Sequence, residues 1–216
     1  MIGLPDAPTP DAPTPDAPTP DRGVSGIVLA GGRSSRFGSD KLAAVRDGTS
    51  LLDRAVAGVA AVAAEVVVVL APDTDRTVAA LDRPVRFVAD PERHGGPLVG
   101  LLAGLEVVEE PLALVAGGDM PDLRADVLGL LVRTLRASDP SVGAVALRSR
   151  GSLVPLPVAV RTGAATDVSR RLVGAGERRL RSLFDHLPTR ILEEGEWRPL
   201  DPDEATLRDV DVPADL

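Results

Sequence analysis

Residues 24–42 read VSGIVLAGGRSSRFGSDKL, and this stretch decides the fold. Residues 24–30 form a short apolar run that ends in glycines, a pattern typical of a strand buried in a parallel sheet. Glycines in the following loop let main-chain N–H groups approach a ligand closely. Arg33, Arg36 and Lys41 add three cations within nine residues. Because N–H donors and cations together attract polyphosphates, we predict a phosphate-binding loop directly after the first strand.

The loop lacks two widespread phosphate-binding motifs. Neither the G-x-x-x-x-G-K-[ST] of P-loop enzymes nor the G-x-G-x-x-G of dinucleotide-binding domains occurs in residues 29–42. The missing dinucleotide motif argues against a Rossmann oxidoreductase. An ordinary strand-to-helix turn with solvated arginines is the simpler alternative, and glycines alone would favour it. Glycines together with three cations after a buried strand favour phosphate binding instead.

Outward from this loop, apolar runs of strand and helix type alternate along the chain. The alternation predicts an α/β fold, a Rossmann-like three-layer α/β/α sandwich with a mainly parallel sheet. Ligands of such sheets bind beyond the carboxyl ends of the strands. We expect further strands at 66–70, 85–88, 112–116, 142–147, 156–160 and 187–192, followed by a loop-like end. We expect helices at 51–64 with Ser50 as N-cap, at 77–81, 97–108, 162–173 and 177–186, and in a segment that Asp122 caps and that runs to about residue 136.

Composition excludes several classes of protein. The 216 residues include no cysteine, which rules out disulfide frameworks, cysteine zinc sites, iron–sulfur clusters and thiol catalysis. With two histidines, a histidine-rich metal site is not expected. There are 24 Lys and Arg against 32 Asp and Glu, a net charge of -8, which argues against nucleic acid or a membrane surface as a partner. Aromatic residues make up 2%, so the core has to consist of Val, Leu and Ala.

The first residues are repetitive and unlike the remainder. Residues 5–19 contain Pro-Asp-Ala-Pro-Thr three times. Because proline removes backbone donors and the segment has almost nothing apolar to bury, we expect residues 1–22 to form a disordered tail. Residues 23–216 then form a single nucleotide-binding domain. A solubilising leader and a docking peptide are both compatible with the tail.

No targeting or membrane-spanning segment is expected. The N-terminus lacks the charged start and the apolar stretch of a signal peptide. The most apolar region, residues 55–71, is interrupted by Glu65 and is typical of a helix followed by a buried strand. We therefore expect a soluble, cytoplasmic protein.

LAGGRSSRFGSDK at residues 29–41 resembles the signature L-A-G-G-x-S-x-R-M-G-x-D-K of the MobA-like nucleotidyltransferases, with Phe37 in place of the usual Met. The resemblance extends over residues 24–216 and implies the fold of the nucleotide-diphospho-sugar transferases. It also implies that the loop holds a nucleoside triphosphate, that Lys41 contacts the phosphates and that Arg36 lies on the same side. The nucleotide-binding residues implied in this stretch are Leu29, Ala30, Gly31, Gly32, Arg33 and Lys41.

Two acidic positions extend the resemblance. Asp90, followed by GGPLVGLLAGL at residues 95–105, resembles the family's nucleotide-binding aspartate and its G-P-L-x-G-L segment. LALVAGGDMP at residues 112–121 resembles a strand followed by the aspartate that holds Mg²⁺ in the family, here Asp119. The chemistry of Mg²⁺ points the same way, because this ion prefers one or two carboxylates together with phosphate oxygens and water. Taken singly, each aspartate is equally compatible with a turn or cap near a proline.

Two later segments are also similar to the family. LRDVDVPADL at residues 207–216 resembles its C-terminal motif, which implies Asp211 as a second metal-binding carboxylate with Asp209 behind it. A solvated acidic tail is the alternative. LVGAGERRLRSLF at residues 172–184 resembles its A-G-E-R-R segment, whose arginines are candidates for binding an anionic acceptor. A solvated helix surface is the alternative there.

The resemblance implies a Mg²⁺-dependent enzyme that transfers GMP from GTP to molybdopterin and releases pyrophosphate, with Lys41, Arg36 and Asp119 as catalytic residues. It also implies transient contact with molybdoenzyme-maturation proteins. A CTP-dependent molybdopterin cytidylyltransferase, a sugar-1-phosphate nucleotidyltransferase and a non-catalytic nucleotide-binding adaptor are the alternatives. Two departures concern base and acceptor: residues 70–72 lack a common Asn, and Val154 replaces a common Gln or His.

Overall fold

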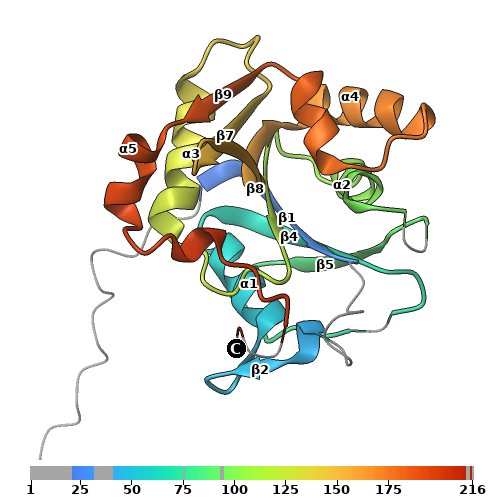
Figure 1. Ribbon diagram of the computed structural model, residues 1–216. Helices are drawn as coiled ribbons and strands as arrows, with labels where there is room; N and C mark the ends of the chain where they lie inside the picture. Colours follow the sequence, from blue (N-terminus) through green and yellow to red (C-terminus); the bar gives the residue numbers. More distant parts are fainter. Residues whose placement is uncertain (1–20, 32–40, 75, 93–94, 213–214, 216) are drawn as a thin grey trace, which may run out of the picture.

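A computed structural model describes residues 21–31, 41–74, 76–92, 95–212 and 215 (Figure 1). Within these residues, seven strands form one sheet of order β5-β4-β1-β6-β8-β7-β9. β8 runs antiparallel to both of its neighbours, and every other adjacent pair is parallel. This mainly parallel sheet confirms the predicted α/β fold class. The strands are β1 (Asp21–Ala30), β4 (Ala63–Leu70), β5 (Val85–Ala89), β6 (Leu112–Gly117), β7 (Ala144–Ser149), β8 (Ser152–Arg161) and β9 (Thr189–Leu192).

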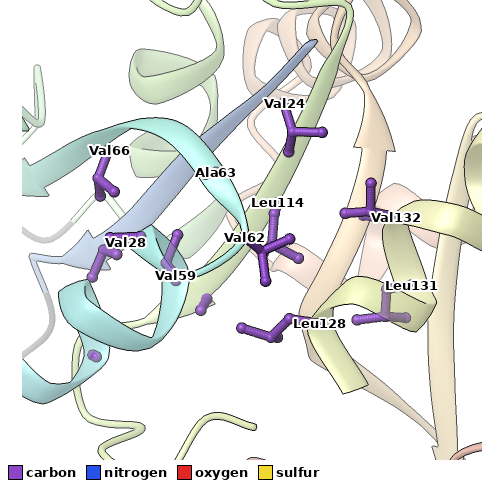
Figure 2. Packing of buried hydrophobic residues seen from close by; sticks show 14 of the residues in the cluster. Val24, Val28, Val59, Val62, Ala63, Val66, Leu114, Leu128, Leu131 and Val132 are labelled. Atoms are coloured by element: carbon purple, nitrogen blue, oxygen red, sulfur yellow. The ribbon is translucent and has the colours of Figure 1, made fainter. Parts of the chain in front are cut away.

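Helices cover both faces of the sheet and complete the predicted three layers (Figure 1). α1 and α3 pack on one face, whereas α2 and α4 pack on the other. On the first face, Val59 of α1 and Leu128 of α3 lie against Val28 and Leu114 of the sheet (Figure 2). The helices are α1 (Leu51–Ala60), α2 (Pro97–Leu105), α3 (Ala125–Ala137), α4 (Thr162–Gly174) and α5 (Glu194–Trp197).

The central strands are apolar on both faces. In β1, Ile27 belongs to one core cluster and Val28 to the other, and both are fully buried. In β4, Val67 and Val68 repeat this division. Continuous apolar runs are typical of parallel strands covered by helices on both sides, and each buried aliphatic side chain stabilises the fold by about 1.5–3 kcal/mol. The strong pattern explains why the strand predictions for β1, β4 and β6 are confirmed. The predicted strand at 85–88 is confirmed by β5, a short edge strand with mostly exposed residues.

One helix prediction and one helix-cap prediction in the middle of the chain are wrong, whereas the helix predicted to end near residue 136 is confirmed by α3. Residues 77–81 form no helix, and the N–H of Ala79 is donated to Oδ1 of Asp53 at 2.7 Å. A helix of this length makes too few internal hydrogen bonds to be stable without packing. Asp122 does not cap α3, which begins three residues later without a side-chain cap. The carboxylate of Asp122 is held by two arginines instead.

Side chains that lie close in sequence to the start of an element determine where two other elements begin. Ser50 caps α1 as predicted, because its Oγ accepts the N–H of Asp53 at 3.0 Å. The helix predicted over 177–186 shortens to the 3₁₀ segment η2 (Leu180–Asp185). The carboxylate of Glu177 accepts the N–H groups of the two residues that follow it, which replaces the bonds of a helical first turn.

The end of the chain is more regular than predicted, because α5 and two 3₁₀ segments follow β9. Trp197 anchors this region: it is fully buried and donates its indole N–H to the carbonyl of Arg148 at 3.0 Å. The remaining short elements are η1 (Lys41–Ala43), β2 (Val45–Arg46), β3 (Thr49–Ser50), η3 (Arg198–Leu200) and η4 (Ala205–Leu207).

Two further expectations concern the N-terminal tail and membrane-spanning segments. The predicted disordered tail falls almost entirely on residues 1–20, which lie outside the described residues, so this domain boundary stays a prediction. Among the residues that the structure does describe, no helix combines the length and the apolar character needed to cross a bilayer.

Candidate active site

A cavity of about 390 Å³ opens at the carboxyl edge of the parallel strands. Leu29 and Gly31 at the end of β1 line it, together with Asp90, which follows β5. The first turn of α2 forms another wall, and Asp119, two residues beyond β6, lines the side next to that strand. The volume is within the range of small-ligand pockets, and the position is the one at which open α/β sheets bind ligands.

Asp90 presents one carboxylate oxygen to this cavity. Its Oδ1 accepts the N–H of Glu92 at 2.9 Å, and the residue is 8% exposed. A Cβ on Gly31 would lie 3.7 Å from Oδ2 of Asp90, and one on Gly100 would lie 3.5 Å from the same oxygen. The two glycines therefore keep the approach to Oδ2 open. Burial raises the pKa of Asp90, although the hydrogen bond from Glu92 acts in the opposite direction.

Three predicted residues meet beside the cavity. The Nζ of Lys41, in η1, lies 2.9 Å from Oδ2 of Asp119 and 2.9 Å from Oδ1 of Asp211. The lysine side chain is 10% exposed, whereas those of Asp119 and Asp211 are 34% and 52% exposed. Two carboxylates thus point at one cation, although they lie far apart in the sequence.

Backbone hydrogen bonds hold the two carboxylates in place. The N–H of Val210 donates to the carbonyl of Asp119 at 3.0 Å, which joins the C-terminal segment to the turn after β6. The side chain of Asp215 accepts the N–H groups of Asp211 and Val212, each at 2.9 Å. The C-terminal segment returns across the sheet edge toward β2 (Figure 1). This return explains how Asp211 reaches a site built mainly from the first half of the chain.

The cluster has more negative than positive charge. Burial tends to lower the pKa of Lys41, but hydrogen bonds to Asp211 and Asp119 outweigh it and raise the pKa, so the amine stays protonated. The pKa of Asp209 is raised, first by burial and then by the negative charges of Asp211 and Asp119. Within the described residues, no group of three or more acidic, His or Cys side chains is arranged to hold a metal. An ion bound here would therefore take further ligands from a substrate or water.

Asp122, which the sequence predicted as a helix cap, instead belongs to the surroundings of the site. Asp122 lies three residues after Asp119, and its side chain is 14% exposed. Arg46 of β2 donates to its Oδ2 at 2.7 Å, and Arg54 of α1 donates to its Oδ1 at 3.0 Å. Arg54 also contacts the carbonyl of Pro121 at 3.4 Å. These contacts fix the turn that carries Asp119, and no local signal predicts them because both arginines are distant in sequence.

Asp122→Asn is expected to lower the free energy of unfolding by about 1–3 kcal/mol at neutral pH, because two arginines lose a charged partner. Burial alone would raise the pKa of Asp122, but the hydrogen bonds from Arg46 and Arg54 outweigh it and lower the pKa. The stabilisation is therefore present above the pKa of the unfolded chain and is lost as the pH falls through the lower folded value. Urea unfolding should show the difference from wild type shrinking in acid.

Asp126→Asn is the matched control, since this exposed carboxylate lies in the first turn of α3. It should leave the free energy of unfolding nearly unchanged. A destabilisation by Asp122→Asn that stays equal from neutral pH to about pH 3 would contradict the ion-pair interpretation.

Of the other residues predicted to bind nucleotide, some line the cavity, one lies in the core and others are outside the described residues. Leu29 and Gly31 line the cavity, whereas Ala30 is buried in the core on the α1 side. Gly32, Arg33 and Arg36 lie outside the described residues, so their predicted contacts with phosphate stay predictions.

The A-G-E-R-R segment packs against the first turn of α2, which forms one wall of the cavity. Arg178 donates to the carbonyl of Val173 at 3.0 Å and pairs with Glu92 at 3.2 Å, while Arg179 pairs with Glu177 at 2.9 Å. The carbonyl of Arg178 accepts the N–H of Leu98, in the first turn of α2, at 3.2 Å. These contacts give Arg178 a structural role at the N-terminus of α2, whereas Arg179 is held by Glu177 within the segment.

Comparison with known proteins shows the family of this chain. Residues 26–191 match the family described as "MobA-like NTP transferase domain". The chain is 36% identical over 200 residues to a "Probable molybdenum cofactor guanylyltransferase" of Chloroflexus aggregans, covering 89% of this chain and 91% of that protein. It is 34% identical over 178 residues to a "Molybdenum cofactor guanylyltransferase" of Burkholderia ambifaria, covering 74% and 81%.

A solved structure shares the fold. It is the "Molybdopterin-guanine dinucleotide biosynthesis protein A" of Archaeoglobus fulgidus, which superimposes with a TM-score of 0.70 at 19% identity. The superposition covers 88% of this chain and 94% of that one. With the family match over most of its length and a relative above 30% identity, the chain belongs to the MobA-like NTP transferase family.

Proposed function

We propose that the protein transfers GMP from GTP to molybdopterin and releases pyrophosphate. The two relatives named as molybdenum cofactor guanylyltransferases support this choice of nucleotide and acceptor. The cluster of Asp119, Lys41 and Asp211 beside a glycine-walled cavity carries the proposal, because it offers both charges that the reaction needs at the mouth of a nucleotide-sized space.

The proposed reaction brings two anions together. The acceptor is a phosphomonoester whose second pKa is about 6, so one oxygen is ionised at neutral pH and needs no strong base. This oxygen attacks the α-phosphorus of GTP, a new P–O bond forms, and pyrophosphate leaves with the electrons of the broken P–O bond. The protein has to orient the two phosphates and neutralise their charge, which are effects of positioning and electrostatics.

A divalent cation, which we propose to be Mg²⁺, suits the donor set. Asp119 and Asp211 would hold it, since their oxygens already lie 2.9 Å from one and the same ammonium nitrogen. Mg²⁺ accepts such a pair when phosphate oxygens and water complete its shell. When bound, the ion supplies charge neutralisation to the phosphate oxygens.

Basic groups near the N-terminus take the remaining phosphate charge in this proposal. We assign Lys41 to the charge that develops at the transferred phosphate, because its ammonium lies next to Asp119. Arg36, Arg33 and the main-chain N–H groups of Gly31 and Gly32 are assigned to the β- and γ-phosphates. Loop N–H groups and guanidinium groups are suited to these oxygens because both donate hydrogen bonds to anions.

Asp90 is assigned to the nucleoside. Its Oδ2 is the acceptor that the glycine walls leave open, and guanine offers an N–H and an amino group on one edge. Oδ2 can accept one of these donors, because Oδ1 already accepts the N–H of Glu92. The choice of guanine over cytosine therefore rests on the names of the relatives.

Gly100→Leu is expected to abolish stabilisation by nucleotide while the fold persists. A Cβ at this position of α2 makes ordinary contacts, 3.5 Å from Oδ2 of Asp90 and 3.7 Å from Cγ1 of Val69, and the longer side chain fills the cavity. Replacing a helical glycine by leucine adds about 0.5–1 kcal/mol of helix propensity. Thermal unfolding with and without GTP and Mg²⁺ measures both effects.

Gly163→Leu in α4 is the control, because a Cβ there meets nothing within 4 Å. Its shift with nucleotide should equal that of the wild type. A wild-type shift in Gly100→Leu would show that the nucleotide binds elsewhere.

The function is tested in two steps. GTP with Mg²⁺ should raise the melting temperature of the purified protein more than CTP, UTP or ATP does. GTP with molybdopterin should then release pyrophosphate, whereas GTP with a sugar 1-phosphate should not. A larger shift with CTP, or turnover with the sugar phosphate, would replace the proposed specificity. Binding of GTP without any pyrophosphate release would favour a non-catalytic adaptor.

We also infer a cytoplasmic protein that acts on small molecules and makes transient contact with molybdoenzyme-maturation proteins. The net charge of -8 supports the absence of nucleic-acid and membrane partners. We propose that residues 1–22 form a tail outside a single nucleotidyltransferase domain of residues 23–216. Limited proteolysis should remove the tail and leave the nucleotide-induced thermal shift unchanged.

A further inference from the structure

Two ion pairs join the same two stretches of the chain. We call these stretches the lysine segment and the aspartate turn, and they comprise residues 41–46 and residues 119–122. Their first residues, Lys41 and Asp119, pair at 2.9 Å, and their last residues, Arg46 and Asp122, pair at 2.7 Å. Along the aspartate turn the two pairs lie three residues apart, which is at most about 10 Å of chain. The lysine segment is therefore attached to the aspartate turn at both of its ends.

Asp122 divides its carboxylate between two arginines that hold different parts of the fold. Its Oδ2 accepts a hydrogen bond from Arg46 of the lysine segment, and its Oδ1 accepts one from Arg54 of α1 at 3.0 Å. Arg54 also donates to the carbonyl of Pro121, so it holds the aspartate turn on the helix. Arg46 instead holds the lysine segment on the turn. The two arginine side chains are 30% and 28% exposed, so replacing either one removes a contact of similar burial.

The middle of the lysine segment has a different anchor. The carbonyl of Ala44 accepts the N–H of Leu51, the first residue of α1, at 3.0 Å, and Ala44 packs against Leu51 and Val210. The N–H of Ala44 donates to the carbonyl of Lys41 at 3.1 Å, which closes the turn of η1. This anchor fixes the segment against α1. The two ion pairs then determine how closely its ends approach the aspartate turn.

One of the two pairs does not persist through the proposed reaction. When a divalent ion takes both carboxylates of the site, the ammonium of Lys41 turns to phosphate. Arg46 and Asp122 are not among the described residues that line the nucleotide cavity. Their network is also balanced in charge, because Arg54 lies 3.8 Å from the carboxylate of Asp47, so that two cations meet two anions. A phosphate therefore gains little by drawing an arginine out of this network.

We propose that Arg46 and Asp122 are positioning residues of the transfer: their ion pair keeps the lysine segment on the aspartate turn while Lys41 exchanges carboxylate for phosphate. This assignment rests on the proposed function for the exchange. With the second pair in place, the ammonium moves between partners while its backbone stays where it is. Without that pair the backbone can shift, and a misplacement of about 1 Å at a reacting group can lower a rate about 10²-fold.

Arg46→Gln is expected to lower kcat about tenfold, because the position of the Lys41 ammonium matters most when charge develops in the transition state. The Michaelis constants for GTP and molybdopterin should change less than about twofold, since Arg46 contacts neither substrate in the proposed site. Arg46→Lys should restore most of kcat, because Arg46 contacts Asp122 through Nη1 and an ammonium can donate the same hydrogen bond. Pyrophosphate release at varied substrate concentrations measures these constants.

Arg54→Gln is the matched comparison, because it removes the other arginine from the same carboxylate and leaves the bond between Arg46 and Asp122. Its kcat should fall less than about threefold, although the free energy of unfolding falls at least as much as in Arg46→Gln. Arg86→Gln removes a 2.7 Å ion pair with Glu65, near the start of β4, and should keep the wild-type kcat. Equal losses of kcat in Arg46→Gln and Arg54→Gln, or no loss in Arg46→Gln, would overturn the proposal.

Hydrogen exchange tests the ion pair without relying on turnover. Lys41→Met removes the first attachment, and exchange of the Ala44 N–H should stay within about threefold of the wild-type rate because the second attachment remains. Exchange in Lys41→Met/Arg46→Gln should be at least about tenfold faster than in Lys41→Met, whereas Lys41→Met/Arg54→Gln should stay within about threefold of Lys41→Met.

The two measurements distinguish this proposal from the proposed function. If the exchange rates are as expected but GTP with molybdopterin releases no pyrophosphate, the proposed function fails, and the ion pair keeps its role in holding the lysine segment. If Lys41→Met alone already exchanges about tenfold faster, or if removing Arg46 adds nothing, that role is overturned whatever the turnover.

Discussion

Asp119→Asn is expected to lower turnover about 10³-fold, equivalent to about 4 kcal/mol of transition-state stabilisation. The amide keeps the shape of the side chain but removes the charge that faces Lys41 at 2.9 Å. Divalent-ion binding should weaken because an uncharged amide oxygen is a poorer ligand for Mg²⁺ than a carboxylate. Turnover is measured by pyrophosphate release, and ion affinity by Mn²⁺ titration followed by electron paramagnetic resonance.

The stability of this variant should change little. Lys41 keeps its second partner, Asp211, and the backbone hydrogen bond between Val210 and the carbonyl of residue 119 does not involve the altered side chain. Asp167→Asn, an exposed position of α4, serves as the control and should keep full activity. Near-normal turnover in Asp119→Asn at saturating Mg²⁺ would remove this carboxylate from the mechanism.

Lys41→Met is expected to have two opposite effects. Turnover should fall about 10²–10³-fold, because a positioned charge at the developing transition state is lost. Binding of Mn²⁺ without nucleotide should become at least about tenfold tighter, because two carboxylates in partly buried surroundings lose the ammonium that competes with the ion. Methionine retains the unbranched apolar stem, so the packing of η1 is preserved.

A spectroscopic measurement on the wild-type protein tests whether the ammonium of Lys41 gives up the two carboxylates when the metal ion and nucleotide bind. Lys41 is the only lysine among the 24 basic residues, so lysine-selective isotope labelling yields a single side-chain resonance. Adding Mg²⁺ with GTP should shift this resonance as the ammonium leaves the carboxylates for phosphate. An unchanged resonance on saturation, or weaker Mn²⁺ binding in Lys41→Met, would show that the ammonium and the ion do not share these ligands.

Several features of the fold are predictable from local sequence because burial leaves a local pattern. β1, β4 and β6 are recognisable as continuous apolar runs, since both faces of these strands are covered by helices. Ser50 is recognisable as a cap because its partner lies three residues away. The predictions fail where weak local signals compete with distant partners, as in residues 77–81, where Asp53 takes the backbone N–H of Ala79.

By itself, the sequence determined the α/β fold class and the seven strands of the main sheet, and it gave the glycine loop after β1, Asp90, Asp119 and Asp211 as candidates. Only the tertiary structure decided that Lys41 lies between two carboxylates that are 78 and 170 residues away. It also decided that Asp122 holds the turn of Asp119 through two arginines. The physical reason is that hydrophobic periodicity records which face of a segment is buried, whereas the meeting of charged side chains depends on how distant loops close over one edge of the sheet.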